Sequence, residues 1–180
     1  MLAIKLIFIG MLLVFLSLDI PVGAFIVGLF PSFLGYFFMY KGLLDISNYS
    51  CCFKKMIVFT RGMIFYSGFL YGINLLGIST LLPLLFSALE FIAIGFSLYI
   101  SFNIIAGIRD IETALEENLN FYQLYFAWKL FAVFSVLPFV TGFVPLLAVT
   151  SMMIGFAVGI YYLYSFYNTM ELFYGSLTNE

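Results

Sequence analysis

Long stretches of this chain carry no charged side chain, and this feature limits its fold more than any other. Glu90 is the only charged residue between Arg61 and Arg109, and none occurs between Lys129 and Glu171. Over the whole chain 64% of the residues are hydrophobic and 9% are charged, whereas a soluble domain has about 45–50% apolar and about 25% charged residues. A soluble fold of 180 residues could not bury so much apolar surface. We therefore expect lipid to be the solvent for most of the chain.

The apolar residues fall into six runs, which predict an all-α fold: an integral membrane six-helix bundle forming a single transmembrane domain, residues 1–180. The predicted spans are residues 1–18, 24–40, 56–76, 81–105, 121–136 and 144–167. The second run is shorter than the roughly 20 residues that a span needs. It also contains Pro31, which can kink a helix or begin one. A re-entrant segment is therefore the alternative there.

The basic residues lie at or near one side of this six-span arrangement, and the turns on the opposite side contain none. They are Lys5, Lys41, Lys54, Lys55, Arg61, Arg109 and Lys129. Cytoplasmic loops of membrane proteins are enriched in lysine and arginine. We therefore expect that side, and with it both termini, to be cytoplasmic.

A short motif recurs where apolar runs end. Gly42-Leu43-Leu44-Asp45-Ile46 returns as Gly107-Ile108-Arg109-Asp110-Ile111 and more faintly as Asn168-Thr169-Met170-Glu171-Leu172. Each copy has an acid at the same place, which predicts three helical hairpins in a pseudo-threefold repeat, over about residues 1–46, 53–111 and 121–172. Lys5 would then face Asp45, Arg61 would face Asp110, and Lys129 would face Glu171. Coincidence is the alternative, because basic residues gather at the inner ends of spans in any case.

One segment of the second run resembles a known pattern. Phe30-Pro31-Ser32-Phe33-Leu34-Gly35-Tyr36, followed by Lys41-Gly42-Leu43, is similar to the Pro-Asp-Phe-Ile-Gly-Tyr and Gly-Leu pattern in small multi-pass membrane proteins of Gram-positive bacteria. Ser32 stands where those proteins usually have an acid. The resemblance covers the second run only. It implies a location in a bacterial plasma membrane and carries no activity with it.

Residues 107–120 form the most polar segment and predict an amphipathic cytoplasmic helix. Ile108, Ile111, Leu115 and Leu119 are spaced as one helical stripe, and Asp110, Glu112, Glu116 and Glu117 lie off it. The helix either lies on the membrane or extends the fourth span. Its acidic charge suits a protein partner better than an anionic lipid surface. We take Ile108, Ile111, Glu112, Leu115 and Glu116 as candidate contacts with a membrane protein partner.

An acid near the middle of a predicted span is the strongest candidate for a ligand-binding group. Glu90 lies about nine residues into the span 81–105. A charged carboxyl at that depth costs on the order of 2.5–3.5 kcal/mol on insertion scales, so it should face protein or water. Ser87, Ser97 and Ser101 fall on the same helical face.

The depth of each basic residue decides which of them can reach Glu90. At a helical rise of ~1.5 Å per residue, Lys129 differs from Glu90 in depth by ~9 Å and Arg61 by ~13 Å. Lys129 is therefore the predicted partner, and it joins Glu90, Ser87, Ser97 and Ser101 in a candidate ligand site. The alternatives for Glu90 are a protonated, purely structural carboxyl and a contact with a helix of another protein.

The residue types exclude several kinds of chemistry. The chain has no histidine, the commonest general base and a frequent zinc ligand. Cys51 and Cys52 are adjacent, a geometry that strains a disulfide between them, so we expect reduced thiols or, alternatively, S-acylation. No phosphate loop, zinc-ligand spacing or nucleophile–base pair occurs. We therefore predict no catalytic residue, no metal and no cofactor, and the net charge of -2 argues against nucleic acid.

Two functions fit this pattern. The first is a non-enzymatic membrane protein acting through interaction, as an assembly factor or subunit of a membrane complex, with residues 107–120 as its contact. The second is a solute-binding or transport component. Six spans in about 180 residues resemble the substrate-binding subunits of energy-coupling vitamin transporters, although the small-residue patch of that family's first span is missing from residues 1–18.

Overall fold

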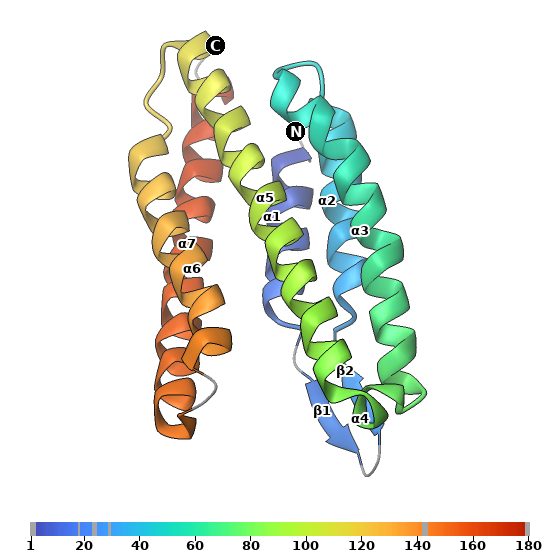
Figure 1. Ribbon diagram of the computed structural model, residues 1–180. Coiled ribbons are helices and arrows are strands. Elements are labelled where there is room, and N and C mark those ends of the chain that lie inside the picture. Colours follow the sequence, from blue (N-terminus) through green and yellow to red (C-terminus); the bar gives the residue numbers. More distant parts are fainter. Residues whose placement is uncertain (1–2, 18, 23–24, 29, 142–143, 179–180) are drawn as a thin grey trace.

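The computed structural model of the protein describes residues 3–17, 19–22, 25–28, 30–141 and 144–178 (Figure 1). The elements in these ranges are α1 (Ala3–Phe15), β1 (Asp19–Val22), β2 (Phe25–Gly28), α2 (Ser32–Ile46), α3 (Cys51–Leu75), α4 (Ile78–Leu81), α5 (Pro83–Leu115), α6 (Phe121–Thr141) and α7 (Pro145–Thr178). The fold is helical, as predicted, with one small β-hairpin.

Four helices are long and apolar enough to cross a membrane, judged by length and composition. They are α3, α5, α6 and the segment Leu146–Ser176 of α7. The helices α1 and α2 have 13 and 15 residues, which correspond to only ~20 and ~22 Å against a hydrocarbon core of ~30 Å. The prediction of a helical membrane protein is thus supported for the four long helices. The prediction of six spans stays a prediction for α1 and α2, which are shorter than the four long helices.

Residues 19–28 differ most from the prediction. Residues 24–40 were expected to run as one apolar segment after a first span ending at residue 18. Instead, β1 pairs with β2 in an antiparallel hairpin, with Asp19 opposite Gly28 and Val22 opposite Phe25. The β-branched and aromatic residues of this segment suit strands. Helix α2 begins only after Pro31, which has a backbone ψ of 122°, because proline disfavours helical geometry in the residue before it.

The end of α5 shows whether the polar segment is a separate helix or a continuation of the fourth predicted span. The predicted amphipathic helix of residues 107–120 is neither separate nor laid on a surface, because α5 continues without a break to Leu115. With 33 residues, α5 is ~50 Å long and exceeds the thickness of a bilayer core. Residues 107–115 of the polar segment therefore extend the fourth predicted span, whereas residues 116–120, also predicted as helix, form the turn before α6.

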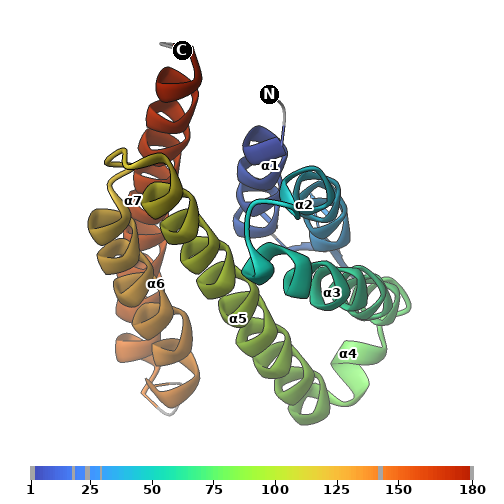
Figure 2. The same cartoon turned by 90° about the horizontal axis from the view of Figure 1, so that it is seen from above.

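Helix α5 runs between two groups of helices (Figure 2). On one side α1 packs on α2 and α2 packs on α3, and on the other side α6 packs on α7. The first turn of α1 and the last turns of α7 lie toward the same end of the molecule (Figure 1). The core also gathers toward that end, around side chains such as Leu43, Phe53 and Phe166, all with 0% exposure. At the other end the large apolar side chains, such as Leu84, point outward, as expected for a surface in contact with lipid.

The structure contains three consecutive helix pairs, α1 with α2, α3 with α5 and α6 with α7. Their lengths differ, so the pseudo-threefold repeat stays a prediction. Five basic groups lie over aromatic rings, those of Lys5, Lys41, Lys55, Arg109 and Lys129. Lys5 Nζ lies 5.0 Å from the ring centre of Tyr174, and Lys129 Nζ lies 4.3 Å from that of Tyr125.

Candidate functional site

A cavity of about 440 Å³ lies where α1, α5, α6 and α7 face one another. Its volume falls within the range of roughly 300–1,000 Å³ that ligand pockets occupy. Most of the wall is apolar and much of it is aromatic, including Met11, Phe15, Phe131, Phe134, Phe156 and Leu163. Phe15 bridges the two groups of helices, since its ring stacks on that of Phe156 with 5.4 Å between centroids.

Hydroxyl groups interrupt the apolar wall on one side. Ser97 and Ser101 lie one helical turn apart on α5, and both line the cavity. The Ser101 hydroxyl donates to the Leu98 carbonyl oxygen at 3.0 Å and accepts from Trp128 Nε1 at 2.9 Å. These bonds fix Ser101, so its oxygen presents a defined polar point on an otherwise apolar surface.

Tyr162 on α7 supplies a further hydroxyl to the cavity wall. The hydroxyl is directed at the Met11 sulfur, 3.7 Å away, and its side chain is 4% exposed. A thioether is a weak hydrogen-bond acceptor. The Tyr162 side chain also interacts with Ser101, so the two hydroxyls lie close enough to act on the same ligand oxygen.

The predicted ligand residues divide into two sets. Ser97 and Ser101 line the cavity, whereas Glu90, Ser87 and Lys129 are not among its lining residues. Glu90 is half-buried on α5, and Ser87, one turn earlier, is exposed. Lys129 is exposed on α6, where it borders a separate hollow together with Arg109 and Phe121. The structure thus brings together the two serines nearest the middle of α5.

The residues predicted to contact a partner are largely occupied within the chain. Ile108 and Ile111 are 3% and 2% exposed and belong to the protein's own core, and Leu115 is packed against that core. The Glu112 carboxylate accepts from the backbone N–H groups of Leu119 at 2.8 Å and Phe121 at 3.1 Å. The stripe seen in the sequence therefore seats the end of α5 inside the molecule. Partner binding by this segment stays a prediction.

Glu116 has a different role in the turn between α5 and α6. It ends α5 in the left-handed backbone conformation, with φ at 56°, and its side chain is exposed. Asn120 also has a positive φ, of 60°. Asparagine is among the non-glycine residues that tolerate this region best. Together with the carboxylate of Glu112, these two residues set the direction in which α6 leaves α5.

The aromatic wall of the cavity was missed by the sequence analysis. Phe131, Phe134 and Phe156 sit on helices that are apolar all round, so no periodic pattern marks the face turned to the cavity. One signal was available, because Pro138 lies inside α6 and lines the cavity. A proline within a helix removes a backbone hydrogen bond and disturbs close packing.

Comparison with known proteins adds no relative: no family model, curated protein or solved structure matches this chain. Its function must therefore be argued from its own geometry.

Proposed function

We propose that this protein is a multi-pass membrane protein that binds a neutral, amphipathic molecule in the cavity between α1, α5, α6 and α7. This is the solute-binding hypothesis of the sequence analysis. The observation that supports it is the cavity itself, about 440 Å³ in volume, with aromatic walls and the Ser97, Ser101 and Tyr162 hydroxyls on its lining. Pockets of this kind, apolar with a few placed polar groups, are the usual sites of small-molecule binding.

The absence of charge among the described lining residues favours an uncharged ligand. Among the described residues, the side chains that line the cavity are all uncharged. A charged ligand would lose its hydration there without gaining an ionic partner, which costs several kcal/mol per ion. We therefore propose a ligand with an apolar body and a hydroxyl or carbonyl group, the chemistry of a neutral lipid or an isoprenoid alcohol.

The rim of the cavity favours entry from the side. Met152 and Phe156 on α7 are 62% and 50% exposed and also line the cavity. In a protein embedded in a bilayer, such side chains face acyl chains. A ligand dissolved in the bilayer could then reach Ser97 and Ser101 without crossing water.

We propose binding rather than catalysis at this site, because its hydroxyls have no basic neighbour in the lining that would activate them. The positive-inside rule supports an orientation with both termini in the cytoplasm, and the resemblance of residues 30–43 supports a bacterial plasma membrane. An interaction function through residues 107–120 remains the second proposal. The exposed side chains of Glu116 and Glu117 support it by offering acidic groups to a partner.

The cavity can be tested with a fluorescent long-chain alcohol bound to the purified protein in lipid nanodiscs. Replacing Ser97 by Leu fills part of the cavity and removes a hydroxyl, so we expect affinity to fall about tenfold, as a lost contact of ~1.4 kcal/mol implies. Ser87→Leu controls for placing leucine on α5, because Ser87 is exposed and is not in the lining. Ser97 also contacts the buried Tyr36, so the melting temperatures of both variants are compared to separate lost binding from lost packing. A long-chain amine with the same label should bind at least about tenfold more weakly than the alcohol.

Two outcomes would contradict the proposal. One is equal affinity for the alcohol in the Ser97→Leu and Ser87→Leu variants. The other is binding of the amine as tight as that of the alcohol, since the uncharged lining would then have no part in selection.

A further inference from the structure

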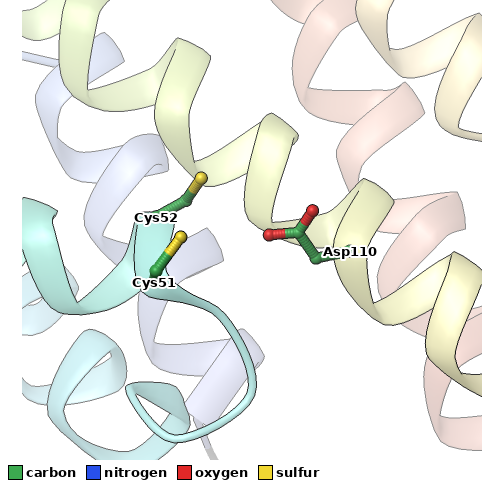
Figure 3. Close-up of side chains that lie close together, drawn as sticks. All are labelled: Cys51, Cys52 and Asp110. Carbon is green, nitrogen blue, oxygen red and sulfur yellow. The ribbon is translucent and has the colours of Figure 1, made fainter.

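The start of α3 and the last part of α5 bring three potential metal ligands together, away from the cavity. They are Cys51, Cys52 and Asp110, and one ligand atom from each lies within 4.8 Å of the other two. Figure 3 shows both thiols and the carboxylate directed into the space between the two helices. Cys51 and Asp110 are exposed and Cys52 is half-buried, so an ion in solution could reach all three.

A close contact between the two helices sets this arrangement. The Phe53 ring, with 0% exposure, lies against the backbone of α5 at Gly107, where a Cβ atom would overlap the ring. Asp110 follows Gly107 by three residues and so lies on the same face of α5. The absence of a side chain at Gly107 therefore allows the first turn of α3 to sit directly against Asp110.

Ser50 ties the cluster together from its buried position. Its hydroxyl caps α3 by accepting from the backbone N–H of Cys52 at 3.0 Å, and it donates a hydrogen bond to the Asp110 carboxylate. Hydrogen bonds of this outer-shell type orient metal ligands and are often nearly as important as the ligands themselves. The carboxylate is thus held facing the thiols in the absence of an ion.

We propose that Cys51, Cys52 and Asp110 form a binding site for a thiophilic divalent cation of the Zn²⁺ class. Thiolate sulfur selects Zn²⁺ and similar ions over Mg²⁺ and Ca²⁺, which prefer oxygen. Zinc–sulfur bonds of ~2.3 Å and zinc–oxygen bonds of ~2.0–2.2 Å place ligand atoms ~3.5–3.8 Å apart in a tetrahedron. Small side-chain rotations would close a cluster spanning 4.8 Å to that geometry.

Binding converts both thiols to thiolates and releases their two protons to water. The fourth position of the tetrahedron is filled by water or by the Ser50 hydroxyl. A disulfide between Cys51 and Cys52 is the competing use of these thiols, but the strained geometry of an adjacent pair opposes it. The bound ion fastens the first turn of α3 to α5, a connection that does not depend on the function of the cavity.

Cobalt(II) is a suitable probe, because its thiolate complexes absorb strongly. Titration of the full chain, reduced and in detergent, should give thiolate-to-cobalt absorption that saturates at one equivalent and disappears on addition of Zn²⁺. We expect Cys51→Ser, Cys52→Ser and Asp110→Asn each to weaken binding at least about tenfold, the lower end of effects at metal sites. Asp45→Asn is the matched control, since Asp45 is also an exposed acid near a helix end but lies outside the cluster.

Alkylation of the wild-type thiols gives a second measurement that needs no variant. Zn²⁺ should protect Cys51 and Cys52 from iodoacetamide, and Mg²⁺ should not. The proposal is overturned if saturating Zn²⁺ leaves both thiols reactive. It is also overturned if the Asp110→Asn variant binds cobalt as tightly as the Asp45→Asn variant. The two thiols would then bind the metal without the Asp110 carboxylate as a ligand.

Discussion

The pair of helices α1 and α2 and the region around the cavity are both built from apolar residues, but their helices make different kinds of contact. In the hairpin, α1 and α2 approach until their backbones touch. A Cβ atom at Gly35 would lie 2.6 Å from the Gly10 carbonyl oxygen and 2.9 Å from the Val14 nitrogen. Around the cavity, aromatic rings fill the space between α1 and the pair α6 and α7. Phe15 of α1 stacks on Phe156 of α7 with 5.4 Å between centroids, and Phe131 of α6 stacks on Tyr162 of α7 with 5.2 Å.

The difference shows what decides packing when lipid is the solvent. Apolar surface alone gives little drive for helices to associate there, so close van der Waals contact must supply the stability. Small residues provide such contact by letting backbones meet. Aromatic rings keep helices apart and, being rigid, leave a space of about 440 Å³ between them. The tight hairpin supplies stability, and the looser region supplies room for a ligand.

Adding a side chain where α1 and α2 touch at glycine should cause the largest loss of stability. Gly35→Ala pushes a methyl group into the backbone of α1, and we expect it to destabilise the protein by up to ~3 kcal/mol, as overpacking does. Gly95→Ala is the matched control on α5, because a Cβ there meets no atom within 4 Å. Thermal unfolding in one detergent, followed by circular dichroism, compares the two. Equal melting temperatures would show that the close approach of α1 and α2 contributes no stability.

A smaller effect is expected where the hairpin meets the looser region. Gly159 on α7 faces the Phe15 ring, and a Cβ at Gly159 would overlap it. Because the obstacle is a side chain beside a cavity, the ring can rotate, and Gly159→Ala should cost only ~1–2 kcal/mol. The displaced ring should also weaken binding of the fluorescent alcohol.

Gly175→Ala, on the same helix and with open space at its Cβ, is the control for the Gly159 variant. Unchanged alcohol affinity in Gly159→Ala would indicate that the ring does not turn toward the cavity.

The smallest effect on stability concerns the turn that joins α5 to α6. Glu112→Ala removes the acceptor for the N–H groups of Leu119 and Phe121, a loss worth ~1 kcal/mol for a helix cap. Glu117→Ala removes an exposed acid from the same turn and should have little effect. Denaturant midpoints of the two variants provide the measurement. If Glu117→Ala lowers the denaturant midpoint more than Glu112→Ala does, the Glu112 carboxylate is not the group in this turn that stabilises the start of α6.

The long helices could be predicted from the sequence because each coincides with an apolar run. The third to sixth predicted spans fall on α3, α5, α6 and α7, whose ends differ from the prediction mainly where polar residues continue a helix, as Arg109 and Asp110 do in α5. The strands of residues 19–28 could not be predicted in this way. A short apolar run carries no periodicity that separates a strand from a buried helix.

The candidate sites were only partly predictable, for two physical reasons. Helical spacing predicts that Ser87, Glu90, Ser97 and Ser101 share one face of α5, but nothing in the sequence fixes how far along that face the cavity extends. Of these four residues, Ser97 and Ser101 line the cavity. Cys51 and Asp110 were recognised separately. Their proximity depends on the Phe53 ring meeting α5 at Gly107, a tertiary contact that no local pattern reveals.

The β-hairpin of residues 19–28 has a consequence for the bilayer around this protein. In the part of the chain that the structure describes, both outer edges of this two-stranded sheet lack strand partners. Unpaired N–H and C=O groups cost several kcal/mol each in hydrocarbon. These edges need hydration or polar headgroups. Since α1 and α2 reach only ~20–22 Å, we expect lipid headgroups to approach the hairpin and the bilayer to be thinner there than beside α5.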